Sequence, residues 1–303
     1  MKKYFILVYV LCLTLSMYAS LSTDLSVDRY FCTAADKVFF DHLLNLTGSI
    51  HGSNFDDTRE IAVFDLGFTN EQRQILSGIE KVQVYQVELT HPDLLKHFAT
   101  LPKEKKMVRG WYAWKPVVIK QALDMFPYVV YLDAGNVVLK PLGDLFKYIQ
   151  KNGYFLIQDP YRFCVGDHCT THVKNKFKLN TSQYAWISKA PNIQASMQGL
   201  NKTMFQSYVL PMYELSKDLK NFEDDGSAPK GFGWGRHDQT LFGIHAYLLG
   251  LKLLEMHRLE ADSSEKKICK VSSYFKRDWR DAHIVFHGYH RLKCRNKIKF
   301  RSS

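Results

Sequence analysis

Several patterns that would place the chain in a common functional class are missing from the sequence. No cysteine pair has zinc-finger spacing, and no segment carries the aromatic motif of an RNA-recognition module. The glycine-rich loop that a dinucleotide-binding domain needs after its first strand is also absent, and CTAADK stands there instead. These absences argue against a nucleic-acid partner and against a nicotinamide-dependent oxidoreductase.

The sequence also lacks internal repeats and linkers rich in proline, glycine or serine. Its 303 residues, 46% of them hydrophobic, are enough for one large domain with a sizeable core. We therefore expect a single domain over residues 25–303. The formal net charge is +11, and six cations fall in the last thirteen residues. They predict a basic tail that is either solvated or directed at an anion.

Residues 1–20 form the longest apolar stretch. Two lysines precede an apolar run from Tyr4 to Leu15, and small residues follow it, as in a secretory signal peptide. A spanning helix needs about 20 residues, but an uncleaved signal anchor also fits the pattern. With either, we expect the rest of the chain in the ER or Golgi lumen, secreted, or exported to the periplasm in a bacterium. Any membrane contact would be through this segment.

The cysteine pattern agrees with an oxidising compartment. Beyond residue 20 the cysteines are Cys32, Cys164, Cys169, Cys269 and Cys294. We predict a Cys164–Cys169 disulfide and, more weakly, a Cys269–Cys294 disulfide, with Cys32 as the free thiol of an apolar segment. Sequons for N-glycosylation start at Asn45, Asn180 and Asn201.

Apolar β-rich runs alternate with helical patterns from residue 29 onward. Strands are predicted at 29–36, 60–67, 82–89, 128–132, 154–158, 184–188 and 283–288. Helices are predicted at 37–51, 69–80, 112–126, 143–150 and 237–251, and Thr69 with Gln72 forms a capping box in the second. This alternation predicts an α/β fold whose mostly parallel sheet has helices on both faces.

Three predicted strands end in a carboxylate. In open α/β sheets, ligands bind beyond the carboxyl ends of the strands, where Asp36, Asp65 and Asp133 are expected. Asp36 and Asp65 also fit the role of a helix cap or turn residue. Asp133 is different, because another β-like run follows Ala134 and Gly135 and no helix starts there. We expect its carboxylate at the mouth of the sheet, with a metal ion as its partner.

The segment YLDAGNVVLKPLGDLF (131–146) resembles the metal-binding segment of glycosyltransferases with the GT-A fold, especially family 8, which includes glycogenin and the lipopolysaccharide galactosyltransferases. Other similar pieces follow in the family's order: CTAADKVFFDHLLNLTGSI, IAVFDLGFTNEQRQIL, WKPVVIKQAL, HDQTLF and VFHGYHR. The resemblance spans roughly residues 28–290. It implies a GT-A fold and transfer of a hexose from a nucleotide-diphosphate sugar, with UDP as the expected nucleotide, to a glycan, protein or lipid. It also implies that the anomeric configuration is retained.

The resemblance assigns donor-binding roles to individual residues. Thr33, Ala34 and Asp36 would line the base and ribose, and Asp65 would end the neighbouring strand. Lys115 would contact the diphosphate, although a surface lysine also fits its position. Arg291, in the basic tail, is a candidate for the same contact.

The metal site departs from the family pattern. Asp133 and His287 would hold Mn²⁺ or Mg²⁺, although His287 also fits a packed core histidine. The family's second aspartate is Gly135 here, which has no ligand atom in a side chain. Either Asn136 or water completes the shell, or the basic tail replaces part of the metal's charge, or catalysis has been lost. In the last case the chain would be a non-catalytic nucleotide-sugar- or carbohydrate-binding protein.

The resemblance places Asp238 and Gln239 beside the reacting sugars. Asp238 would contact hydroxyl groups of the donor or acceptor sugar, and the pair are the candidate catalytic residues. Asp238 also fits the N-cap of the helix that follows it.

Overall fold

The computed structural model describes residues 28–101, 106–159, 163–255, 268–273, 279–286, 288 and 292–302. The predicted signal segment, His287 and Arg291 lie outside these residues. Among the helices that are described, none is long and apolar enough to cross a membrane.

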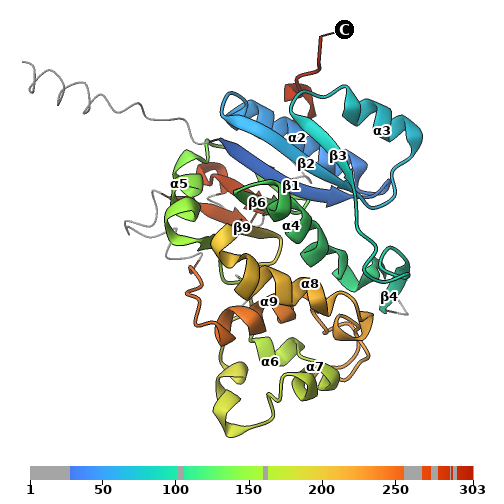
Figure 1. Ribbon diagram of the computed structural model, residues 1–303, viewed down its shortest axis with the longest axis vertical. Coiled ribbons are helices and arrows are strands. Elements are labelled where there is room, and N and C mark those ends of the chain that lie inside the picture. Colours follow the sequence, from blue (N-terminus) through green and yellow to red (C-terminus); the bar gives the residue numbers. More distant parts are fainter. Residues whose placement is uncertain are drawn as a thin grey trace, which may run out of the picture.

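A six-stranded sheet organises the fold (Figure 1). In sheet order its strands are β3 (Val82–Gln86), β2 (Thr58–Asp65), β1 (Arg29–Ala35), β6 (Tyr128–Leu132), β9 (Met197–Asn201) and β8 (Tyr154–Phe155). The first four run parallel, and β9 is antiparallel to both β6 and β8. The chain therefore extends the sheet from β1 in both directions, with β2 on one side and β6 on the other.

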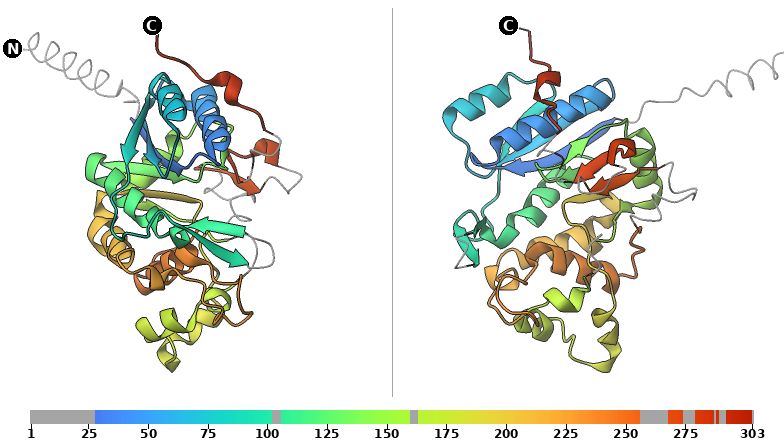
Figure 2. Two further views of the ribbon diagram at one scale, coloured as in Figure 1. Left: turned by 90° about the vertical axis from the view of Figure 1, so that its right-hand side faces the viewer. Right: turned by 180° about the vertical axis from the view of Figure 1, so that it is seen from behind.

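Helices cover both faces of this sheet (Figures 1 and 2). One face carries α2 (Phe40–Asn54), α3 (Asn70–Ser77) and α5 (Gly143–Asn152), and the other carries α4 (Trp114–Met125), α8 (Leu210–Leu215) and α9 (His237–Leu248). The remaining α-helices are α6 (Val165–His168) and α7 (Thr171–Lys176). Shorter turns of helix are η1 (Gly110–Tyr112), η2 (Ser182–Ser188), η3 (Lys202–Met204), η4 (Phe205–Val209), η5 (Leu219–Asn221), η7 (Trp279–Asp281) and η9 (Arg295–Lys297).

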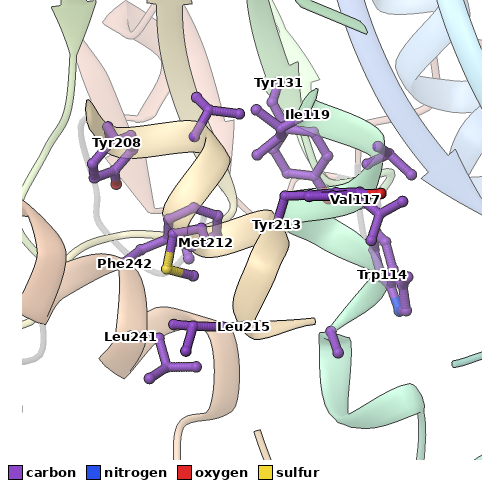
Figure 3. Packing of buried hydrophobic residues seen from close by; sticks show 14 of the residues in the cluster. Trp114, Val117, Ile119, Tyr131, Tyr208, Met212, Tyr213, Leu215, Leu241 and Phe242 are labelled. Atoms are coloured by element: carbon purple, nitrogen blue, oxygen red, sulfur yellow. The ribbon is translucent and has the colours of Figure 1, made fainter. Parts of the chain in front are cut away.

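Two hydrophobic cores lie on the two faces of the sheet. Successive side chains of a strand point to opposite faces. In β6, Val129 and Tyr131 therefore enter the core under α4, while Val130 and Leu132 enter the core under α2. Figure 3 shows side chains of α4, α8 and α9 packed with Tyr131 in the first core. Burial on both faces explains why β6 is a continuous apolar run.

Two smaller sheets flank the main one. The hairpin of β4 (His97–Leu101) and β5 (Lys106–Arg109) precedes α4. The second sheet has the order β10 (Val271–Ser273), β11 (Ile284–Phe286) and β7 (Val137–Val138). In it, β7 directly follows the turn at Asp133–Asn136, and β11 pairs antiparallel with β7. The chain segment that precedes His287 therefore ends next to this turn.

The predicted elements are mostly confirmed. The capping box at Thr69 and Gln72 is present, and the strand expected after Asp133 forms as β7. The strand predicted at 184–188 is wrong, because this segment forms the 3-10 helix η2. Lys189 N and Ala190 N donate back to the Trp186 carbonyl, so the backbone forms helical turns and does not pair with a neighbouring strand here.

The basic tail does not project into solvent as a free end. Residues 292–302 pack over α2, as Figure 2 shows, and reach the edge strand β3. Cys294 N donates to Asn45 Oδ1 at 2.6 Å, and Lys299 N donates to His51 Nδ1 at 3.0 Å. The described cations of this segment are nevertheless exposed, so the expectation of a solvated tail holds for their side chains, whereas the backbone packs on α2.

The predicted disulfides are not formed, since all five described cysteines are free thiols. Cys164 and Cys169 stand at opposite ends of α6. At about 1.5 Å per residue their Cα atoms are at least about 7 Å apart, which is too far for an undistorted bridge. Cys294 is held against α2 by its hydrogen bond to Asn45. Cys32 is buried in β1, as its apolar segment predicted.

Candidate functional site

A cavity of about 410 Å³ opens at the carboxyl ends of β1 and β6. This is the point where the sheet order reverses, the usual position of ligand sites in open α/β sheets. Its walls come from the end of β1, the β4–β5 hairpin, η1 and the turn after β6. The lining residues are Ala34, Ala35, Asp36, Phe39, Leu66, His97, Met107, Val108, Arg109, Tyr112, Trp114, Asp133, Ala134, Gly135, Asn136 and Ser196.

On the β1 side of the cavity, Asp36 is tied to the β4–β5 hairpin. Its Oδ1 accepts from Val38 N and Phe39 N, and its Oδ2 accepts from Arg109 at 2.9 and 3.1 Å. His97 Nε2 lies 3.6 Å from the same oxygen. Burial raises the pKa of Asp36, but the hydrogen bonds and charge of Arg109 outweigh burial and hold that pKa below its ordinary value. Asp36 therefore caps a turn and anchors a hairpin at the cavity wall.

On the β6 side, Asp133 faces the cavity with 36% of its side chain exposed. Its Oδ1 accepts a short hydrogen bond from the buried Tyr131 hydroxyl. The turn that follows is fixed by Ser196, whose carbonyl accepts from Asp133 N and from the Asn136 side chain, both at 2.8 Å. The strand β6 is thus followed by a carboxylate that the Tyr131 hydroxyl holds from one side and that faces the cavity on the other.

Lys115 lies behind Asp133 and is buried. Its ammonium Nζ is 3.2 Å from Asp133 Oδ1, 2.8 Å from Asp238 Oδ2 and 3.4 Å from the Ala195 carbonyl. Burial lowers the pKa of Lys115, but the two carboxylates outweigh burial and raise that pKa above its ordinary value. The ammonium group thus forms ion pairs with two carboxylates and donates a hydrogen bond to one carbonyl. In this arrangement Lys115 positions Asp133 and Asp238.

Asp238 lies in the first turn of α9, where Arg236 and not Asp238 holds the N-cap position. Burial raises the pKa of Asp238, Lys115 opposes the shift, and Asp133 adds to it. The neighbouring Gln239 donates to Asp159 and, at 2.6 Å, to the Ile193 carbonyl. Asp238 thus forms one cluster with Lys115 and Asp133, called the Lys115 cluster below. The Gln239 amide, in contrast, is hydrogen-bonded to Asp159 and to the Ile193 carbonyl.

Other predicted site residues take different positions. Ala34 lines the cavity, and Thr33 is buried in β1 without lining it. Asp65 ends β2 without lining the cavity, and its carboxylate binds Arg73 Nε at 2.7 Å and accepts from Gly67 N and Phe68 N. The structure therefore brings Asp36 and Asp133 to one cavity and leaves Asp65 in a turn of its own.

The described residues alone do not form a site for a resident divalent cation. No group of three or more histidine, cysteine or acidic side chains in this part of the chain could hold one. Asp133 already shares an oxygen with an ammonium and a hydroxyl group, and Gly135 offers no ligand. The predicted partner His287 and the predicted diphosphate contact Arg291 fall outside the described residues.

Arg109 and Tyr112 belong to the site but were not predicted from the sequence. Tyr112 lines the cavity wall, and burial raises its pKa to about 12, with Lys115 opposing the shift. The segment RGWY (109–112) carries one usable signal, because a glycine beside two aromatic residues indicates a close backbone approach. In the structure, Gly110 indeed packs on the Leu94 carbonyl.

Comparisons with known proteins give similarity in structure alone. No protein-family model matches the chain, and no curated protein matches its sequence. The apo structure of WbbM, a bifunctional glycosyltransferase, matches with a TM-score of 0.51 at 12% identity, over 91% of this chain and 49% of that one. This chain thus spans about half of WbbM.

Two further matches have lower scores. Apo mouse xyloside xylosyltransferase 1 gives a TM-score of 0.48 at 13% identity, over 86% of this chain and 97% of that one. The galactosyltransferase LgtC with donor and acceptor sugar analogues gives a TM-score of 0.45 at 12% identity, over 85% of this chain and 86% of that one. The likeness to WbbM, together with the sheet order, shows that the chain has the fold of the GT-A glycosyltransferases.

Proposed function

We propose that the protein is a glycosyltransferase that moves a hexose from a nucleotide-diphosphate sugar, with UDP as the nucleotide, to a glycan, protein or lipid acceptor. One observation carries the proposal. In a GT-A fold, the cavity at the reversal point of the sheet ends in Asp133, and behind this carboxylate lies the buried pair of Lys115 and Asp238. We further propose that the sugar keeps its anomeric configuration, and that the reaction takes place outside the cytosol, as residues 1–20 suggest.

The lining residues suggest how the donor would be placed. The base and ribose would lie beside Ala34 and the Asp36–Arg109 pair, where small side chains and apolar surface border the cavity. The hexose would approach Asp133, whose free side can accept hydrogen bonds from sugar hydroxyl groups. Asp238 and Gln239 remain the proposed catalytic residues, and Lys115 holds Asp238 in place.

A Mn²⁺ or Mg²⁺ ion bound by Asp133 and His287 stays a prediction. Since the described residues do not form such a site, our proposal assigns no step to the metal. Titration of UDP into the protein by calorimetry, with Mn²⁺ or with EDTA, measures the metal dependence separately from nucleotide binding. UDP binding in either condition supports the donor site, and its absence from both would overturn it.

The second candidate function is a non-catalytic nucleotide-sugar-binding protein with the same fold. Gly135 favours it, because the chain lacks the second carboxylate of the family motif.

The two functions differ in turnover. UDP release from a panel of UDP-sugars, with and without acceptor sugars, should be detectable for the transferase, and NMR of the product should show a retained anomer. Asp238→Asn should then abolish turnover but leave UDP binding within about threefold, whereas the exposed control Asp124→Asn should change neither. UDP binding without turnover would support the second candidate.

A further inference from the structure

Two turns with left-handed backbone meet beside the cavity. In η1, Gly110, Trp111 and Tyr112 have φ values of 53°, 49° and 62°, and His237 at the start of α9 has φ 44°. Bulky L-residues seldom adopt such angles, and residues that do so cluster at functional sites when their surroundings enforce the conformation. Three of these four residues carry aromatic rings, so the conformation is unusual in both turns.

Each strained turn leads directly into a helix of the Lys115 cluster. The η1 turn precedes α4, whose second residue is Lys115, and the His237 turn is followed at once by Asp238. The 2.8 Å ion pair between Lys115 and Asp238 therefore joins the first turns of the two helices. Any shift of one turn relative to the other would change this distance.

Ring contacts hold the two turns together. The Trp111 ring contacts two other rings. Its centroid is 5.4 Å from that of Phe98, with an interplanar angle of 17°, and 5.1 Å from that of His237, with an interplanar angle of 33°. The Tyr112 ring is 5.6 Å from His237. His237 Nδ1 also bonds to the Phe222 carbonyl at 2.8 Å. The strained conformations are thus fixed from several sides.

A close backbone contact fixes η1 as well. A Cβ added at Gly110 would lie 1.8 Å from the Leu94 carbonyl oxygen, so no other residue fits there. Gly110 N donates to the Lys96 carbonyl at 2.7 Å. The turn is therefore clamped against the segment before β4, and the remaining freedom between the two turns is limited by the Trp111–His237 contact.

We propose that Trp111 and His237 are positioning residues, and that their ring contact sets the placement of Lys115 between Asp133 and Asp238. For the rate of sugar transfer, this inference rests on the proposed function. The placement of Lys115 itself does not depend on that function, because the distances from its ammonium group to the two carboxylates are set by where α4 begins relative to α9. Loss of the ring contact should release the ammonium group and, through it, the Asp133 carboxylate at the cavity.

His237→Asn is the informative variant. Asparagine tolerates φ near 44°, so strain is relieved, but the ring is lost. We expect lower thermal stability, because the ring contacts and the hydrogen bond to the Phe222 carbonyl are lost, and kcat for sugar transfer lowered about tenfold to a hundredfold, since small misplacements at a reacting centre have large effects. His237→Phe keeps a ring in the same place and should retain kcat within about threefold. Lys178→Asn is the matched control, because Lys178 has φ 54° in an exposed turn after α7. It should leave kcat unchanged.

A second measurement does not depend on turnover. The Lys115 ammonium group should give a slowly exchanging ¹H–¹⁵N NMR signal, assigned by its absence in Lys115→Arg. We expect the signal in the wild type, in His237→Phe and in Lys178→Asn, and its loss in His237→Asn. Persistence of the signal in His237→Asn, or its equal loss in His237→Phe, would overturn the inference. Failure of the wild type to release UDP from any donor would count against the proposed function alone.

Discussion

At the scale of single residues, Lys115 is almost without contact with solvent, and its ammonium group forms ion pairs with Asp133 and Asp238 and a hydrogen bond to the Ala195 carbonyl. We predict that Lys115→Met lowers the free energy of unfolding by about 3–5 kcal/mol, because two buried or half-buried carboxylates then lose their cation. Denaturant unfolding measures this. The exposed pair of Lys217 and Glu214, 2.7 Å apart, supplies the control, and Lys217→Met should cost about 0–1 kcal/mol.

A double variant separates charge from packing at this position. Asp238→Asn added to Lys115→Met removes one of the two carboxylates that the first change leaves unpaired. Part of the lost stability should then return, since interacting sites are not additive. If Lys115→Met destabilises no more than Lys217→Met, the ion pair does not hold the cluster together.

Gly135 allows a test of the metal question. It lines the cavity and does not have a positive φ, so a side chain adds no backbone strain there. We predict that Gly135→Asp weakens UDP binding in EDTA about tenfold, because a second carboxylate near Asp133 repels the diphosphate. Mn²⁺ should restore binding, since two carboxylates supply a better set of ligands. Calorimetry measures both, and Gly135→Asn is the neutral control. UDP affinity that is the same with and without Mn²⁺ in Gly135→Asp would contradict this.

At the scale of elements, the location of the cavity could be predicted from the sequence. The buried runs of β1 and β6 stop just before Asp36 and Asp133, and the alternation of strands and helices indicated parallel neighbours whose carboxyl ends share one edge. Asp65 followed the same pattern, yet Arg73 and two backbone amides bind it in a turn. The pattern gives the edge of the sheet but not which carboxylate faces a ligand.

Elements with weak local signals could not be predicted. The segment MQGLN of β9 has a central glycine and no β-branched residue, and only its pairing between β6 and β8 makes it a strand. Likewise, Arg109 reaches Asp36 across 73 positions of sequence. Such partners depend on tertiary packing, as does the choice of acceptors around Lys115.

The contact between the tail and α2 should make stability depend on pH. Burial lowers the pKa of His51 to about 4, and Lys299 and Lys81 add to the effect. The unfolded chain takes up this proton near pH 6.5, so between the two values it holds more protons than the folded chain, and stability falls as pH decreases. From pH 7.5 to pH 5 we expect His51 to contribute a loss of about 2 kcal/mol.

A variant isolates this contribution. His51→Asn keeps an acceptor near the Lys299 amide but does not titrate. Urea unfolding at the two pH values should show a loss smaller by about 2 kcal/mol in the variant. The same pH dependence in both proteins would mean that His51 is not held neutral in the fold.

At the scale of the whole molecule, the positive charge of the described residues is not concentrated at the cavity. The described tail places Arg295, Lys297 and Lys299 over α2 and its C-terminal end, where Lys299 lies 3.4 Å from the centre of the Phe55 ring. At the cavity itself, Arg109 pairs with Asp36, and Lys115 pairs with two carboxylates. The net charge of +11 therefore gives no support for donor binding through this part of the tail. Recognition of the donor therefore has to come from individual side chains at the cavity and not from the overall charge.

The three sequons test the predicted export route at the same scale. Asn45 is buried and its Oδ1 accepts from Cys294 N, while Asn201 is buried and donates to the Ile149 and Gln150 carbonyls. Asn180 is exposed in the turn after α7. If residues 1–20 direct secretion, the full chain expressed in eukaryotic secretory cells should carry a glycan at Asn180, because a glycan on either buried amide would block native packing.

Digestion with an N-glycosidase measures this as a change in mobility on a gel. The change should disappear in Asn180→Gln, and Asn180→Gln should fold and bind UDP as the wild type does, since the side chain is exposed and donates to Asn175 within the same turn. Asn45→Gln, in contrast, should weaken the contact between the tail and α2 without changing the glycan. A mobility change that survives Asn180→Gln would mean that Asn45 or Asn201 is modified before the chain folds. No change in the wild type would argue against entry into the secretory pathway, and the expected location of the reaction would then have to be given up while the cavity and its cluster stand.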